Sequence, residues 1–153
     1  MMVGVEDDVH EITAVPGEDK LRGTNPHALL VHLFGLFHVF YMFRQYDQMK
    51  SAVEKYFDHA PKVISWSLLY FHSAQKFMGG LVSFWIFRKT NDAVWLERGA
   101  KCKLDIQQWS ESCEWNFQSK FYLLQAEEHY SSGDHDRAMT FYDLAISSSR
   151  KHR

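Results

Sequence analysis

A chain of 153 residues with a formal net charge of -2 is long enough for one compact core, and its mixed charges give no general basic field for nucleic acid or an anionic membrane. Hydrophobic residues make up 46% of the chain and charged residues 24%, as in an ordinary globular protein, whereas the aromatic share of 16% is high and predicts a core of large rings. Two cysteines, Cys102 and Cys113, are too few for a secreted disulfide framework, and the first ten residues lack the features of a signal peptide, so we expect free thiols and a cytoplasmic location.

Residues 1–24 predict a mobile acidic leader. They hold six acidic residues against two basic ones and show no sustained helical spacing of apolar residues. The helical domain that we expect covers residues 25–153. Its first helix begins at Asn25 and Pro26, because asparagine caps helix N-termini well and proline is tolerated in the first turn, and it extends to about Arg44.

The next two predicted helices are separated by a proline. Residues 45–47 predict a tight turn, and a second helix follows to about His59, since apolar residues recur there at helical spacing. The proline after it breaks the chain, because the residue before a proline is pushed out of the helical region. A third helix extends from Lys62 to about Arg88, and its central pair of glycines at 79–80 predicts close contact with another helix.

Three further helices complete the chain. Residues 90–92 supply capping side chains for a fourth helix, which ends at a break predicted at residues 110–112. A fifth helix is expected from about Glu114 to Tyr130, and a sixth from about Asp136 to Ser149. No segment combines strand alternation with hairpin turns, so we predict an all-α fold of about six helices, a short α-solenoid of stacked hairpins. The three antiparallel hairpins cover about residues 25–59, 62–110 and 114–150.

The sequence patterns that carry catalytic or metal chemistry do not occur in this chain. His27, His32 and His38 are spaced so that they fall on different faces of a helix, whereas a pair of metal ligands needs a common face. Phosphate-binding loops, nucleophile elbows and Cys-x-x-Cys pairs are absent from the sequence. We therefore expect no enzyme activity, no cofactor and no bound metal. The apolar stretch from Ala28 to Phe43 falls short of the roughly 20 residues that spanning a membrane requires, so we expect no membrane span.

The last third of the chain has the small residues of a tightly packed helical hairpin. Ala126, Ala138 and Ala145 allow two antiparallel helices to approach closely, while Tyr142 fills the space beside them and Gly133 permits a sharp reversal. A hairpin of this tetratricopeptide type buries its apolar face by stacking on neighbouring hairpins. The pattern therefore favours a recognition or positioning surface.

The segment from Trp109 to Ile146 also resembles a known helical region. The residues that carry the resemblance are Trp109-Ser110-Glu111, Asn116, Lys120, Leu123-Leu124-Gln125-Ala126-Glu127, Gly133-Asp134, Ala138, Tyr142-Asp143 and Ala145-Ile146. They look like the tetratricopeptide-like region that follows the ATPase domain in large multidomain signalling proteins, which combine an AAA-type predicted ATPase with serine/threonine kinase and often sensor histidine kinase domains. The resemblance implies a scaffold that connects or regulates such domains in signal transduction, as part of a longer protein.

The same resemblance places a partner-binding groove on the inner helix of the last hairpin. Its positions correspond here to Lys120, Leu123, Glu127 and Tyr130. We expect the partner to be a protein or a neighbouring domain of the same polypeptide, and not nucleic acid. The alternative is a helical bundle that uses its surplus of Trp and Phe to hold an apolar or aromatic small molecule.

Overall fold

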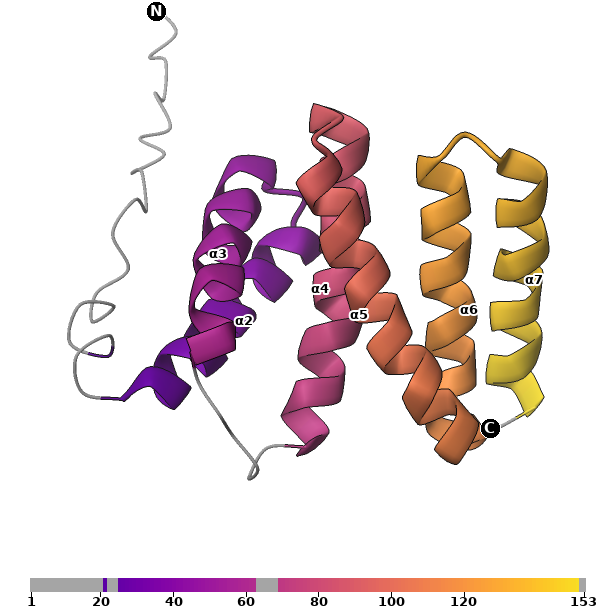
Figure 1. Cartoon of the computed structure of the whole chain (residues 1–153), viewed down its shortest axis with the longest axis horizontal. Helices are drawn as coiled ribbons and strands as arrows, with labels where there is room; N and C mark the ends of the chain where they lie inside the picture. Colours follow the sequence, from indigo (N-terminus) through magenta and orange to yellow (C-terminus); the bar gives the residue numbers. More distant parts are fainter. Residues whose placement is uncertain (1–20, 22–24, 63–68, 152–153) are drawn as a thin grey trace, which may run out of the picture.

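The computed structural model describes Leu21 and residues 25–62 and 69–151, and every regular element within these residues is helical (Figure 1). The elements in chain order are α2 (Pro26–Met42), α3 (Tyr46–His59), the short 3-10 helix η1 (Ala60–Lys62), α4 (Leu69–Thr90), α5 (Ala93–Ser112), α6 (Glu114–Ser131) and α7 (His135–Lys151). The prediction of an all-α chain is confirmed for this part of the protein. The predicted leader falls outside the described residues, with the exception of Leu21, which packs against the core.

Consecutive long helices pack against each other in pairs, so that α2 lies against α3, α4 against α5 and α6 against α7. Figure 1 shows the three pairs in a row, in chain order, with α4 and α5 in the middle. The last two pairs are joined most closely, because α6 contacts both α5 and α4. The first pair contacts α4 through the faces of α2 and α3.

The first hairpin begins where the sequence predicts and turns slightly earlier. The Asn25 side chain accepts a hydrogen bond from the backbone N–H of Ala28 at 3.0 Å, and Pro26 occupies the first helical position. The reversal takes place at residues 43–45, where Arg44 adopts a left-handed φ of 58°. The turn predicted at residues 45–47 is therefore displaced, since α3 has already begun at Tyr46.

The boundaries of the middle hairpin agree in part with the prediction. Residues 60–62 form the 3-10 turn at the expected proline break. The start predicted for the third helix at Lys62 is not observed, because Lys62 belongs to this turn; the next six residues lie outside the described part, and α4 is described from Leu69. Asp92 caps α5 by accepting a hydrogen bond from the Val94 N–H at 3.1 Å.

The last hairpin has the predicted helices with small shifts at their ends. The break expected at residues 110–112 occurs instead at Cys113, because α5 continues through Ser112. Gly133 has a φ of +81° in the turn between α6 and α7, a conformation that glycine adopts without steric cost. Both cysteines are free thiols, with Cys102 buried and Cys113 half-buried.

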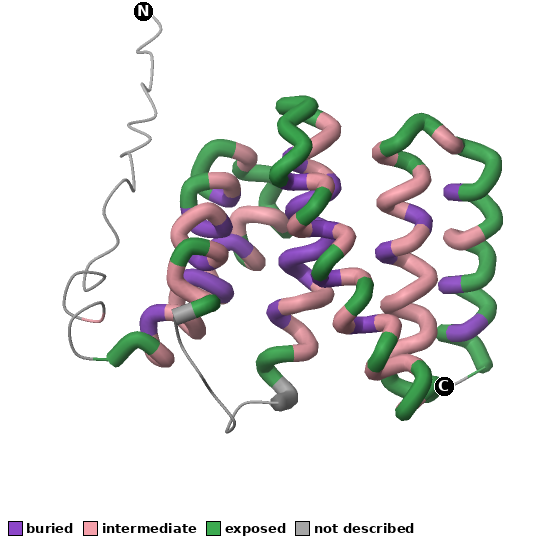
Figure 2. The backbone as a smooth tube through the Cα atoms, in the orientation of Figure 1, coloured by how far each residue is buried: buried purple, intermediate pink, exposed green. Residues whose placement is uncertain are grey.

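Large side chains fill the interior of the first two hairpins. Phe37 and Phe84 are fully buried, and the Phe37 ring meets the Tyr56 ring edge to face with centroids 5.4 Å apart. Figure 2 shows that buried residues are densest in α2, α3 and α4, whereas α7 is exposed along most of its outer side. Within the described helices, none is long and apolar enough to cross a membrane.

Glycines set how closely α4 approaches α5 and α6. A Cβ on Gly99 would lie 2.7 Å from a ring carbon of Phe84, and one on Gly80 would lie 2.7 Å from a methyl carbon of Leu124. Such distances are below ordinary van der Waals contact. The close contact predicted for the glycine pair at 79–80 is therefore observed, with Gly80 facing Leu124 of α6, while a Cβ on Gly79 would lie 3.3 Å from a ring carbon of Phe57 of α3.

Candidate protein-binding groove between helices α4, α6 and α7

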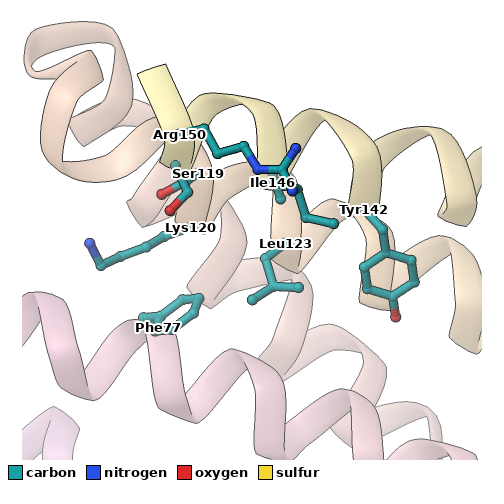
Figure 3. Close-up of a pocket in the computed structure, with 9 residues that line it drawn as sticks. Phe77, Ser119, Lys120, Leu123, Tyr142, Ile146 and Arg150 are labelled. Carbon is teal, nitrogen blue, oxygen red and sulfur yellow. The ribbon is translucent and has the colours of Figure 1, made fainter. Parts of the chain in front are cut away.

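An open groove of about 410 Å³ lies where α6 and α7 face α4. Figure 3 shows Phe77 of α4 directed toward Leu123 of α6, with Ile146 and Tyr142 of α7 on the far side. The complete lining consists of Phe77, Ser119, Lys120, Leu123, Tyr142, Ala145, Ile146, Ser149 and Arg150. Its floor is therefore apolar, with polar groups at its edges.

Basic side chains stand at one end of this groove. Lys120 comes from α6 and Arg150 from α7, and no carboxylate belongs to the lining (Figure 3). The Lys120 ammonium donates to the backbone carbonyl of Asn116 at 2.5 Å and lies 5.7 Å from the centroid of the Phe117 ring. Arg150 makes no hydrogen bond or ion pair with any other described residue. The positive charge at this end is therefore not neutralised inside the described part of the protein.

A polar cluster occupies the face of α6 beyond the other end of the groove. The Arg88 guanidinium donates to one carboxylate oxygen of Glu127 at 2.8 Å and to the Ser131 hydroxyl at 2.9 Å. The Tyr142 hydroxyl donates to the second carboxylate oxygen of Glu127 at 2.7 Å. Both oxygens of this carboxylate are thus engaged, and the cluster ties α4, α6 and α7 together.

The tyrosines near Glu127 are held in their neutral form. Burial raises the pKa of Tyr142, and its hydrogen bond to Glu127 raises it further, because that bond needs the hydroxyl proton. Burial also raises the pKa of Tyr41, with the charge of Glu127 as the next cause. Tyr142 therefore remains a hydrogen-bond donor at neutral pH.

The four predicted groove residues separate into two sets. Lys120 and Leu123 line the groove. Glu127 is directed into the cluster with Arg88, and its side chain is only 19% exposed. Tyr130 is outside the lining and 46% exposed, with its ring 5.2 Å from the Arg88 guanidinium carbon.

The residues of the small-residue signature lie in α6, in α7 and in the turn between them. Ala126 of α6 and Ala138 and Ala145 of α7 are buried. Tyr142 is half-buried and contributes to both the groove and the Glu127 cluster. Gly133 supplies the reversal. These positions hold α7 against α6 and so form one wall of the groove.

A second, smaller cavity of about 330 Å³ lies between α3, α4 and α5. Its wall includes the Tyr56 hydroxyl, which donates to the buried Gln75 amide oxygen at 3.4 Å, and the Cys102 thiol, whose pKa burial raises to about 11. His72 also lines it, and burial lowers the pKa of this imidazole. Lys76 also lines this cavity and forms an ion pair with Asp105, so its positive charge is neutralised within the protein.

The four tryptophans within the described residues do not line either cavity. Trp95 is buried, Trp85 packs edge to face on Tyr41 and Tyr46, and Trp109 contacts Phe117. Trp115 is 61% exposed, and Trp66 lies outside the described residues. Within the described residues, no group of three histidines, cysteines or carboxylates is arranged to hold a metal ion.

Several residues of the groove and its supporting cluster were not among those predicted from the sequence. Phe77, Ile146 and Arg150 reach the groove from α4 and α7, and Arg88 supports it from 39 positions before Glu127. Periodicity within one helix cannot relate residues that far apart. The sequence carried at most a weak signal, because Ile146, 49% exposed, is one of three exposed apolar residues of α7 together with Met139 and Leu144.

Comparisons with protein-family models, with curated proteins and with solved structures found no significant match to this chain.

Proposed function

We propose that this chain is a non-catalytic helical-repeat module that binds a protein segment in the groove between α4, α6 and α7. The observation that carries the proposal is the groove itself, an apolar floor of about 410 Å³ exposed between three helices. Exposed apolar concavities with polar edges are typical of protein recognition sites. Lys120 and Leu123 contact the partner directly, whereas Glu127 acts through the wall residue Tyr142 that it holds.

The order of helix contacts supports a tetratricopeptide-like stack as the framework of this module. Each hairpin packs internally, and α6 reaches back to both helices of the preceding hairpin. In repeat proteins this nearest-neighbour packing presents a continuous surface to partners. From the resemblance of residues 109–150 we also propose that the partner is a protein or a neighbouring domain within a multidomain ATPase or kinase signalling protein.

The test is a selection of random twelve-residue peptides displayed on phage, with the full chain as the target. We expect binders whose affinity falls about tenfold with Ile146→Ser, because this change removes an apolar contact from the groove. Met139→Ser is the matched control, since Met139 lies on the same helix, is 63% exposed and does not line the groove. Binders that are equally sensitive to both changes, or to neither, would contradict the groove assignment.

A second candidate function is the holding of a small apolar or aromatic molecule, which the cavity of about 330 Å³ between α3, α4 and α5 favours. Native mass spectrometry of the purified protein checks this function. A retained molecule would appear as added mass that is lost on unfolding. The mass of the bare chain alone would contradict it.

A further inference from the structure

The two ends of the groove offer different chemistry to a bound peptide. At one end Lys120 of α6 points away from the apolar floor, whereas the guanidinium of Arg150 of α7 lies beside Ile146 (Figure 3). The lining near them also includes Ser119 and Ser149. At the other end the wall is formed by Tyr142, whose hydroxyl is already bonded to Glu127. A peptide therefore finds free charged groups at the first end only.

The positive charge at that end has no internal counterpart among the described residues. The carboxylate of Glu114 pairs with Lys151 at 2.8 Å, and that of Glu127 pairs with Arg88 at 2.8 Å. Neither of these acids lines the groove. A partner that brings its own carboxylates would supply the missing charge, whereas a basic partner would be repelled.

We propose, on the basis of the function proposed above, that the occupant of this groove is an acidic peptide segment with an apolar anchor. A large aliphatic or aromatic side chain of the segment seats among Phe77, Leu123 and Ile146. Aspartate or glutamate side chains close to the anchor in sequence pair with Lys120 and Arg150. In an extended peptide, residues two positions apart point to the same side and are about 7 Å apart, which lets one face carry both the anchor and a carboxylate.

A peptide fits these features better than a polyanionic surface does. Binding to nucleic acid rests on many phosphate contacts along a basic stripe, and binding to anionic membranes on clusters of about four to eight basic residues. The groove lining contributes two cations, Lys120 and Arg150, next to an apolar floor. A peptide with one apolar anchor and a few carboxylates matches a site of two cations next to an apolar floor.

The experiment uses the peptides selected on the full chain and reads their composition. We expect aspartate and glutamate to be enriched within three positions of a Leu, Ile, Phe or Trp anchor. Synthetic versions of the best binders are then measured by fluorescence anisotropy. Replacing their acidic residues by Gln or Asn should weaken binding about tenfold, and raising NaCl from about 50 to 300 mM should weaken it several-fold, because exposed charge pairs are screened by salt.

Charge-reversal variants of the protein test whether Lys120 and Arg150 are the groups that bind the acidic residues of the peptide. The double variant Lys120→Glu/Arg150→Glu should weaken the acidic peptides at least tenfold. Lys89→Glu/Lys101→Glu is the matched control, because it changes the net charge equally at exposed residues outside the groove. Lys120→Arg should retain binding. Circular dichroism of each variant confirms that the helices are intact.

The outcomes separate this inference from the function on which it rests. If the selected peptides are neutral or basic, and their binding depends on Ile146 but not on Lys120 and Arg150, the proposal of an acidic occupant is wrong. The groove would then still be a binding site. The absence of any groove-dependent peptide would overturn both. Binding of phosphatidylserine vesicles or of a single-stranded oligonucleotide that exceeds peptide binding and is lost with the same charge reversal would also overturn the proposal.

Discussion

At the scale of single residues, Glu127 determines how the last hairpin is held. Its two carboxylate oxygens accept hydrogen bonds from Arg88 of α4 and Tyr142 of α7, at 2.8 and 2.7 Å. A half-buried carboxylate with both oxygens bonded stabilises the fold mainly because losing either donor leaves charge without a partner. Glu127 thus supports the groove through Tyr142 and does not itself line it, although it was predicted from the sequence as a binding residue.

Replacing Arg88 by Met tests this role. We predict a loss of about 1–3 kcal/mol in the free energy of unfolding, because Glu127 keeps its charge and loses its cation. Urea denaturation measures the loss. The neighbouring exposed residue supplies the control, since Lys89→Met should change stability by about 0.5 kcal/mol or less. Equal effects of the two changes would show that the cluster contributes no stability.

The buried thiol of Cys102 predicts a loss of stability at alkaline pH. Burial raises its pKa to about 11, whereas the thiol of the unfolded chain titrates near 8.5. The unfolded state therefore loses its proton first, so the contribution of this group is complete below about pH 8.5 and is lost as pH rises toward 11. We expect Cys102→Ala to flatten the fall in unfolding free energy over this range.

Cys113→Ala is the control for that measurement, because Cys113 is half-buried and is replaced by the same residue. Urea titrations at several pH values between 8 and 11 give the slopes. Burial also raises the pKa of Tyr56, so some alkaline loss of stability should persist in the Cys102 variant. Identical slopes for the two variants and the unchanged protein would contradict the assignment to Cys102.

At the scale of helices, the absence of a side chain at a few positions sets the distances between neighbouring helices. The Phe84 ring is fully buried against Gly99, where three of its carbons lie within 2.9 Å of the place a Cβ would take. The ring is rigid, so neither α4 nor α5 can accept even one methyl group without moving. Leu124 beside Gly80 is more adaptable, because its methyl groups rotate with its χ angles.

Alanine substitutions rank these contacts. Gly99→Ala should lower the unfolding free energy by about 1–3 kcal/mol through overpacking, and Gly80→Ala by less. Gly35→Ala is the matched control within α2, since a Cβ there meets no atom within 4 Å, and it should raise stability by about 0.5–1 kcal/mol through helix propensity. Thermal or urea unfolding measures all three. A stabilising Gly99→Ala would contradict the packing of α4 on α5.

Local chemistry in the sequence predicts the helices, because each signal acts within a few residues. Asn25 and Asp92 cap helices through their own side chains, and Gly133 turns the chain at a positive φ. The prediction placed the first turn too late in the sequence, because the residue that adopts the left-handed conformation is Arg44. Arginine is not a residue type that favours this conformation, so the sequence shows no local sign of the turn there. Local signals of this kind locate helix ends to within a few residues.

The groove was predictable only in part, for a physical reason. Lys120 and Leu123, which line the groove, were identified because the resemblance to a tetratricopeptide-like region implies groove positions on the inner helix of the last hairpin. Phe77 and Arg150 come from other helices, and the pairing of Arg88 with Glu127 joins residues whose separation in sequence has no period. Such contacts depend on how the hairpins stack, which the sequence of one helix does not encode.

At the scale of the whole molecule, the three hairpins form a row whose interior is filled by large rings, while its last two members leave an apolar groove open. The core of α2, α3 and α4 is dense in buried residues, and the exposed side of α7 is not. On the function proposed above, the first part of the row supplies stability and the last part recognition. This division predicts that partner binding changes the groove and leaves the core of the first hairpin unaffected.

Methyl NMR of the full chain, titrated with the tightest selected peptide, tests this division most directly. We predict that the methyl signals of Leu123 and Ile146 shift progressively, while those of Leu29 and Leu33, both 1% exposed in the first hairpin, remain in place. Shifts that are confined to the first hairpin, or spread evenly over all the helices, would contradict a binding surface between α4, α6 and α7.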